Sequence, residues 1–158
     1  MKVKRNRNSG FTLIELLVVV SLIGVLTTLV MANLNSARQR GRDAERKADL
    51  RNIQTGLRLF YNDKGKYPES KTSDEIWGCD TGPDYSACEW GDSWEGDDMV
   101  YMNVLPDDPL STQVYRYTRN DPDSYTIQAC LENKSDESGQ TASDETWCSS
   151  GWMYQVQQ

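Results

Sequence analysis

A long apolar run from Phe11 to Ala32 dominates the hydrophobic pattern of the chain, and its only charged residue is Glu15. As a helix, its 22 residues would reach about 33 Å, enough to cross the roughly 30 Å hydrocarbon core of a bilayer. A carboxylate in such a span costs roughly 2.5 to 3.5 kcal/mol at the centre and less near an end. The pattern therefore predicts a membrane-spanning helix in which Glu15 needs a partner.

The helix is predicted to continue beyond the apolar run, because no proline occurs before Pro68. Apolar residues in this continuation recur at three and four residues and form one stripe: Leu50, Ile53, Leu57 and Phe60. Gly65 marks the end of the helix near Asn62. We expect a transmembrane helix over 11–34 and an amphipathic half over 35–62, whose apolar stripe holds the rest of the chain.

A second stripe, of small residues, points to nearly the opposite side of the amphipathic half. It consists of Ala37, Gly41, Ala44 and Ala48. Small side chains would let a helix of another subunit approach closely. Alanine also has the highest helix propensity and suits a solvated helix face, so the sequence leaves both interpretations open.

The remainder, residues 63–158, is predicted to form a globular head. Its segment 69–98 shows no clear period, and we interpret it as a variable loop. Aromatic, β-branched or alternating apolar residues predict three later strands: 114–118, 125–131 and 152–156. Residues 119–123 read as a turn between the first two. A C-terminal sheet over 112–156, packed on the helix, gives an α+β fold.

Charge is distributed unevenly along the chain, whose net charge is −7. Residues 1–10 contain four cations and no acid, so by the positive-inside bias they should stay in the cytoplasm. Without them, 13 cations and 24 acids remain, a net charge of −11. Residues 11–58 contain seven cations and four acids, whereas residues 59–158 contain six and 20. A basic helix is therefore joined to an acidic head.

The junction between the basic residues and the apolar run reads Gly-Phe-Thr-Leu-Ile-Glu-Leu-Leu-Val-Val over residues 10–19. It closely resembles the processing and assembly signature of type IV pilins and of the pseudopilins of type II secretion. The resemblance implies that residues 1–10 form a leader, that a prepilin peptidase cuts between Gly10 and Phe11, and that the new amino group of Phe11 is methylated. It also implies that Glu15 pairs with the Phe11 amine of a neighbouring subunit inside a filament.

Two simpler interpretations of the apolar run are a signal-anchor helix, with its carboxylate at headgroup level, and a secretory signal peptide. A secretory signal is removed together with its apolar run. The pilin-like cut would precede the run, which then stays in the mature protein. The family resemblance also implies the pilin fold, a long helix packed against a small antiparallel sheet of about three strands.

The resemblance implies a structural subunit that polymerises into a type IV pilus for attachment, motility or DNA uptake. The alternative is a pseudopilin of a type II secretion system. The length and the four cysteines favour a pilus, because major pseudopilins are generally shorter and often lack cysteine. Expected partners are other copies of the chain, the prepilin peptidase and an inner-membrane assembly platform with its ATPase-driven machine. The precursor would lie in the cytoplasmic membrane with its head outside, and the mature subunit in an extracellular filament.

Four cysteines in an exported head suggest two disulfides with three connectivities. We favour the local pairs, Cys79 with Cys88 and Cys130 with Cys148. A zinc site is the competing use, but the chain contains no Cys-x-x-Cys pair and no histidine.

Catalytic chemistry has little support in the sequence. Without histidine there is no Ser-His or Cys-His pair. The neighbouring carboxylates Asp107 and Asp108 could do acid-base work, but adjacent acids in a turn are usually solvated or capping. We predict no enzyme and no cofactor, except for a minor hypothesis of calcium.

The calcium hypothesis concerns the acidic loop before the last strand. Its carboxylates are Asp136, Glu137, Asp144 and Glu145. Several pseudopilins resembling this chain hold calcium in a loop at this place. The spacing matches no calcium motif, and a solvated loop is the alternative.

A third function is DNA binding by the basic residues between Arg38 and Arg58, through contacts with phosphates. Arginines next to a membrane span also suit lipid headgroups or the acidic head of a neighbour.

Overall fold

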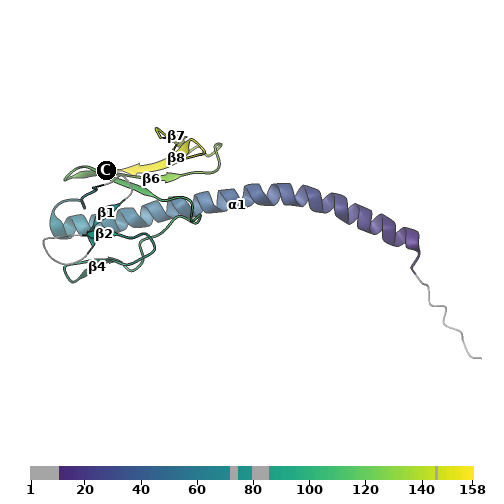
Figure 1. Ribbon diagram of the computed structural model, residues 1–158, viewed down its shortest axis with the longest axis horizontal. Coiled ribbons are helices and arrows are strands. Elements are labelled where there is room, and N and C mark those ends of the chain that lie inside the picture. Colours follow the sequence, from purple (N-terminus) through teal and green to yellow (C-terminus); the bar gives the residue numbers. More distant parts are fainter. Residues whose placement is uncertain (1–10, 72–74, 80–85, 145) are drawn as a thin grey trace, which may run out of the picture. The chain divides into compact units, whose positions relative to one another are not determined.

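The computed structural model describes residues 11–71, 75–79, 86–144 and 146–158, so the predicted leader lies outside the described residues. The chain divides into two compact units, Met1–Arg38 and Gln39–Gln158, the second of which we call the C-terminal unit. Figure 1 shows one helix and several short strands. They are α1 (Leu13–Lys64), β1 (Ile76–Cys79), β2 (Ser86–Cys88), β3 (Trp94–Gly96), β4 (Met99–Met102), β5 (Arg116–Asp121), β6 (Ser124–Cys130), β7 (Gln140–Thr141) and β8 (Trp152–Gln157).

Helix α1 ends two residues beyond the predicted Asn62, at Lys64. Gly65 follows with φ +67°, a left-handed conformation that glycine adopts at little cost. Its N–H donates to the carbonyl of Tyr61 at 2.8 Å, which satisfies one of the last helical carbonyls. The glycine read from the sequence as a stop signal therefore acts as the C-terminal cap.

The predicted apolar stripe of α1 forms the centre of the main core. Leu50, Ile53 and Leu57 are fully buried, and Phe60 is 3% exposed. Phe60 stacks on Trp94, with ring centroids 5.7 Å apart, and also contacts Tyr101. Burying one side chain of this size contributes about 1.5 to 3 kcal/mol, so this stripe fixes α1 within the C-terminal unit.

The main sheet is antiparallel and has the strand order β5-β6-β8-β7. The predicted turn over 119–123 is too long, because β5 continues through Asp121 and only Pro122 and Asp123 form the turn. The Asp121 carboxylate accepts hydrogen bonds from the Asp123 N–H, at 2.8 Å, and from the Ser124 hydroxyl. Such an aspartate turn reverses the chain within two residues.

The predicted alternation in β6 is confirmed, since Tyr125, Ile127 and Ala129 are buried in the main core. The sheet has four strands rather than the predicted three. The extra strand, β7, has only two residues, too few to show a pattern. The opposite face of the sheet carries a second, smaller core made of Cys130, Ala142, Cys148 and Met153.

The segment 69–98, interpreted from the sequence as a loop, contains β1, β2 and β3. Strand β1 pairs with β2, and β3 pairs with β4. These strands have three or four residues each, too few to show an alternating pattern. Packing of Trp94 on Tyr101 helps to hold β3 and β4 together. At Gly56 of α1, a Cβ would lie 2.7 Å from the Met102 side chain, so the hairpin needs a glycine there to approach the helix.

The four cysteines form two disulfides, and these are the local pairs favoured by the sequence. Cys79 joins Cys88 across the β1–β2 hairpin, and Cys130 at the end of β6 joins Cys148. Cross-links of this kind typically stabilise a fold by about 2 to 4 kcal/mol. The first closes the hairpin of a segment with few core residues, and the second ties the acidic loop to the sheet.

Candidate functional site

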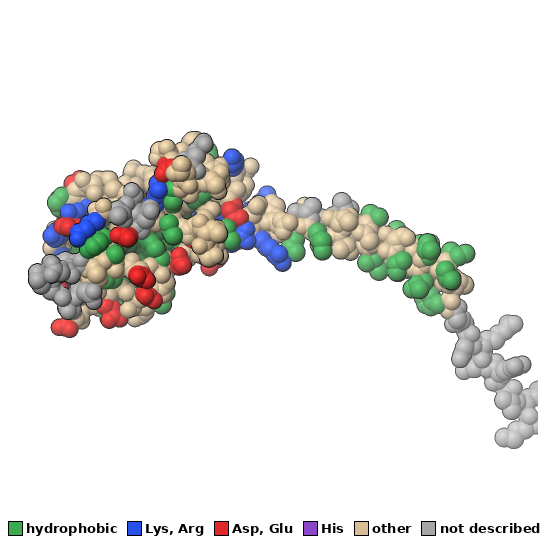
Figure 2. All heavy atoms as spheres, in the orientation of Figure 1, with side chains coloured by type: hydrophobic (Ala, Val, Ile, Leu, Met, Phe, Trp, Pro, Cys, Tyr) green, Lys and Arg blue, Asp and Glu red, His purple; other side chains and the backbone are tan. Residues whose placement is uncertain are grey.

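The apolar side chains of the first unit are exposed on all sides of α1. Among the described large hydrophobic residues from Phe11 to Leu34, the exposed fraction runs from 83% at Phe11 to 44% at Leu34. Figure 2 shows these side chains around the first part of the helix. By length and composition, α1 is the one helix in the described part of the chain that could cross a membrane. A helix that is apolar all round needs lipid or other helices around it.

The N-terminus of α1 is closed by a reciprocal cap between Thr12 and Glu15. The backbone N–H and the hydroxyl of Thr12 donate to Glu15 Oε2, at 2.9 and 2.8 Å. In return, the Glu15 N–H donates to Thr12 Oγ1 at 3.2 Å. This is a capping box, and its Thr-x-x-Glu pattern was readable in the sequence. Sequence reasoning assigned Glu15 to assembly alone and missed this local role.

The predicted processing and assembly residues have different positions in the structure. Gly10 lies outside the described residues. Phe11 is exposed, one residue before the cap. Glu15 bonds to Thr12 of its own chain, and its predicted partner, the Phe11 amine, belongs to another subunit.

A buried ion-pair network lies in the C-terminal unit and was missed by sequence reasoning. Its centre is Arg46, which is fully buried. The Arg46 guanidinium binds Asp108 in bidentate fashion, at 2.8 and 2.9 Å, and donates to Asp43 at 2.8 Å and to Glu132 at 2.9 Å. Burial alone would lower the pKa of Arg46, but these acceptors outweigh it and raise the pKa.

The outer part of this network joins α1 to the chain just after β6. Arg42 forms a bidentate pair with Glu132, at 2.7 and 2.6 Å, and this pair lowers the pKa of the Glu132 carboxyl. The buried Asp43 accepts the backbone N–H groups of Glu132, at 2.9 Å, and Asn133, at 2.8 Å. One turn of helix therefore fixes two distant segments of the C-terminal unit.

The network changes two interpretations made from the sequence. Asp108, considered as part of an acid-base pair in a turn, is buried against Arg46 and also accepts the Leu110 N–H at 2.8 Å. Arg42 and Arg46, considered for DNA phosphates, bind carboxylates of their own chain. An arginine on a predicted helix cannot be assigned a partner before the fold is known, because its acceptor lies far away in sequence.

Two of the acids considered for calcium bind cations of the protein. Asp136 pairs with Lys47 of α1 at 2.5 Å, and Asp144 pairs with Arg116 of β5 at 2.9 Å. Glu137 is exposed, and Glu145 lies outside the described residues. The described residues contain no group of three acidic, cysteine or histidine side chains placed to hold one metal ion. Calcium binding stays an untested prediction, and the two ion pairs oppose it because calcium would have to displace them.

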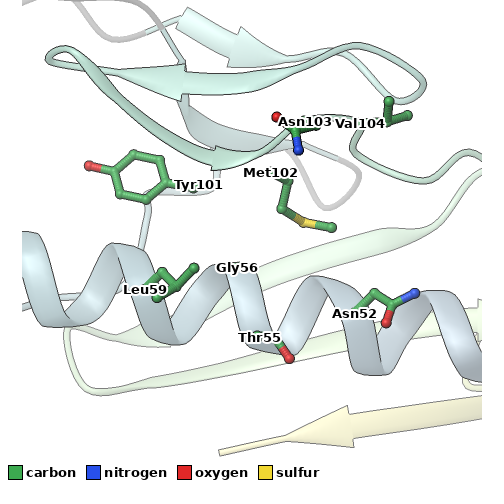
Figure 3. A pocket seen from close by; sticks show the side chains of 8 residues that line it. All are labelled: Asn52, Thr55, Gly56, Leu59, Tyr101, Met102, Asn103 and Val104. Atoms are coloured by element: carbon green, nitrogen blue, oxygen red, sulfur yellow. The ribbon is translucent and has the colours of Figure 1, made fainter.

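A shallow groove of about 350 Å³ lies between the exposed side of α1 and the end of β4 (Figure 3). The helix lines it with Asn52, Thr55, Gly56 and Leu59, and the other wall consists of Tyr101, Met102, Asn103 and Val104. Leu59 and Val104 are about half exposed. Among the described parts of the chain, the groove contains no cluster of groups suited to catalysis or metal binding.

Residues 5–31 match the family described as the prokaryotic N-terminal methylation motif. The chain carries this methylation motif at its N-terminus. Phe11, the capping box of Thr12 and Glu15, and most of the exposed apolar helix fall inside it. The N-terminal residues that the sequence predicted for processing and assembly therefore lie in the region that matches this family.

Relatives of this chain include a pilin and secretion components. The chain is 37% identical over 63 residues to the type IV major pilin protein PilA of Myxococcus xanthus, which covers 40% of this chain and 29% of that protein. It is 34% identical over 68 residues to the type II secretion system core protein G of Pseudomonas aeruginosa and 29% identical over 68 residues to that of Aeromonas hydrophila. Each of the latter two matches covers 43% of this chain and 48% of the relative.

The resemblance to type IV pilins and pseudopilins is confirmed by these matches. The chain spans less than half the length of these curated relatives. No solved structure matches the chain.

We expect the C-terminal unit to lose stability in acid, because ion pairs depress carboxyl pKa values in the folded state. Lys47 and Ser138 lower the pKa of Asp136 to about 2, and Arg42 lowers the pKa of Glu132. The unfolded values are about 3.9 and 4.3. A depressed folded pKa contributes stability above the unfolded value, and this contribution is lost as the pH falls through the folded value.

Thermal unfolding of the detergent-solubilised chain should therefore show a Tm that falls as the pH is lowered from about 5 to about 2. In the variant Lys47→Met/Asp136→Asn, the acid-induced fall should be smaller. A Tm that rises as the pH falls from 5 to 2 would contradict this assignment.

Proposed function

We propose that the mature chain is a structural subunit of a type IV pilus, produced by cleavage between Gly10 and Phe11 and by methylation of Phe11. One observation carries this proposal: the apolar first part of α1, exposed on all sides, falls largely within the N-terminal methylation motif and contains a single carboxylate. Such a helix suits a membrane before assembly and a bundle of like helices afterwards. The similarity to a type IV major pilin supports it.

Assembly would proceed by transfer of the apolar helix from lipid into the filament core. Cleavage creates a cationic amine at Phe11, and Glu15 of the neighbouring subunit neutralises it. An ion pair in apolar surroundings is strong only if both partners are present and hydrogen-bonded. The pair would therefore set the axial register of neighbouring subunits, because it forms at only one axial offset between them.

The proposal includes a location and partners. The precursor lies in the cytoplasmic membrane with its leader inside, and the C-terminal unit lies on the far side, where two disulfides are stable. Prepilin peptidase, an assembly platform and an ATPase-driven machine process and extrude it. No enzymatic activity is part of this function.

A pseudopilin of a type II secretion system is the second candidate, and the similarity to core protein G of two organisms favours it. Deletion of the gene distinguishes the two. Loss of sheared surface filaments with normal secretion of extracellular enzymes supports the pilin, whereas retention of those enzymes in the periplasm supports the pseudopilin.

Processing gives the direct test of this function. In Gly10→Val, the branched side chain should prevent cleavage at a site that accepts glycine. Mass spectrometry of the membrane protein should then show the intact leader, whereas the wild-type chain should begin at methylated Phe11. As a control, Ser9→Ala should be processed like the wild type. A mature chain beginning at Phe11 in Gly10→Val would show that the peptidase assignment is wrong.

A further inference from the structure

We propose that three arginines on the exposed face of α1, Arg40, Arg51 and Arg58, dock onto an acidic surface of a second copy of this chain. We call these residues the arginine row. The acidic surface lies around β3 and consists of Glu89, Asp92, Glu95, Asp98 and Asp107. This inference rests on the proposed filament, and it names the surface through which C-terminal units contact each other.

The arginine row lies on one side of the helix. Its members are 11 and seven residues apart, which is close to three turns and two turns of 3.6 residues, so they share a face over about 27 Å. All three are exposed, and none forms an ion pair within the part of the chain that the structure describes. No acid stands three or four residues from Arg51 or Arg58. Arg58 and Asp123 line the same cavity, but the Asp123 carboxylate accepts a hydrogen bond from the Tyr61 hydroxyl and forms no ion pair with Arg58 in the described residues.

The acidic surface belongs to a segment without any cation. Residues 72–115 contain eleven Asp and Glu and no Lys or Arg. The five surface acids named above are all exposed. Two backbone bonds, Gly91 N–H to the Leu105 carbonyl and Leu105 N–H to the Asp92 carbonyl, both 2.7 Å, hold the two ends of this surface together. Figure 2 shows acidic side chains gathered on the side of the C-terminal unit where Figure 1 labels β4.

One chain cannot join its own row to its own acidic surface. Hairpin β3–β4 packs on α1 at Gly56, beside Met102. At 100° per residue, Gly56 points roughly 150° away from Arg51 and Arg58. The two surfaces therefore lie on different sides of α1, with opposite charges, and each remains available to another molecule.

Two different complementary surfaces on one chain make a heterologous contact, in which the row of each copy meets the acidic surface of the next. Such a contact does not close on itself in a pair and generates an open helical array unless its rotation closes a ring. The second copy is therefore the occupant that the charges favour, and the geometry agrees with a filament.

The test compares charge reversals in the full-length chain expressed in cells that lack the wild-type subunit. Arg51→Glu/Arg58→Glu should lower the yield of sheared, pelleted filaments by at least about tenfold, because like charges would then face each other at every contact. The matched control, Lys66→Glu/Lys134→Glu, makes the same change in net charge at two exposed lysines outside the row and should assemble at the wild-type yield.

Rescue separates a contact from a folding defect. Adding Glu89→Lys/Asp92→Lys to the row variant restores opposite charges and should restore the filament yield, while immunoblots of whole cells should show equal total amounts of subunit in every variant. Assembly of the row variant at the wild-type yield would overturn the inference. So would a defect that the compensating reversal leaves unchanged.

Two further outcomes have distinct meanings. If the wild type and the lysine control also give no filaments, the proposed function fails, whatever the row does. If the row variant assembles normally but its filaments no longer retain double-stranded DNA in a pull-down, the row binds nucleic acid, and the contact between subunits is rejected.

Discussion

Glu15→Leu should abolish filament assembly while the processed monomer persists in the membrane. The change leaves the Phe11 amine of a neighbouring subunit unpaired in an apolar core, and stranding one member of a buried pair costs about 3 to 5 kcal/mol at every subunit. It also makes the span more apolar, so membrane insertion should survive. Shearing of cells, pelleting of filaments and immunoblots of the pellet and the membrane fraction measure the two pools.

Two variants separate the charge of Glu15 from its capping role. Glu15→Gln keeps a side chain that can complete the capping box but removes the charge, so assembly should still fail. Thr12→Val removes the capping hydroxyl and keeps the carboxylate, so assembly should persist. If Glu15→Gln and Glu15→Leu both give the wild-type filament yield, the pairing mechanism is refuted.

Asp108→Ala should strongly destabilise the C-terminal unit. It leaves the fully buried Arg46 without its bidentate partner, and breaking a buried pair in this way typically costs 3 to 5 kcal/mol, or about 10 °C or more in Tm. Thermal unfolding of the detergent-solubilised full-length chain, followed by near-UV circular dichroism, measures the loss.

The matched control is the exposed pair of Glu69 with Arg119, whose atoms are 3.3 Å apart. Glu69→Ala should change the free energy of unfolding by about 1 kcal/mol at most. The double variant Arg46→Met/Asp108→Leu should recover little of the lost stability, because it also takes the cationic partner from the buried Asp43. Equal stability of Asp108→Ala and Glu69→Ala would show that the buried network does not hold the fold.

Local patterns predicted the helix and most of the sheet. The stripe of Leu50, Ile53, Leu57 and Phe60 predicted a buried helix face because helical spacing is a property of neighbouring residues. Likewise, the alternation in β6 predicted which side chains are buried. The hairpins β1–β2 and β3–β4 could not be predicted, because strands of three or four residues are too short to show an alternating pattern. The β3–β4 hairpin is held by packing of Trp94 and Tyr101 on Phe60, which is distant in the sequence.

The candidate site likewise contains residues that a local pattern predicted and residues whose partners no local pattern could predict. Glu15 and Phe11 were readable because their meaning lies in a short motif. The partners of Arg42 and Arg46 were not, because Asp108 and Glu132 lie 62 to 90 residues away in the chain. The cap at Thr12 was readable as well, because Thr12 and Glu15 have the Thr-x-x-Glu spacing of a capping box.

The reciprocal bonds between Thr12 and Glu15 also bear on how a filament could be dismantled. If a subunit left its neighbour and returned to lipid, the Glu15 carboxylate would still accept hydrogen bonds from the hydroxyl and the N–H of Thr12 in its own chain. In the proposed filament, release of a subunit would exchange the Phe11 amine for these two donors of Thr12, which would lower the free-energy cost of returning the Glu15 carboxylate to lipid. The capping residue Thr12 would thus allow subunits of the proposed filament to return to the membrane and to be assembled again.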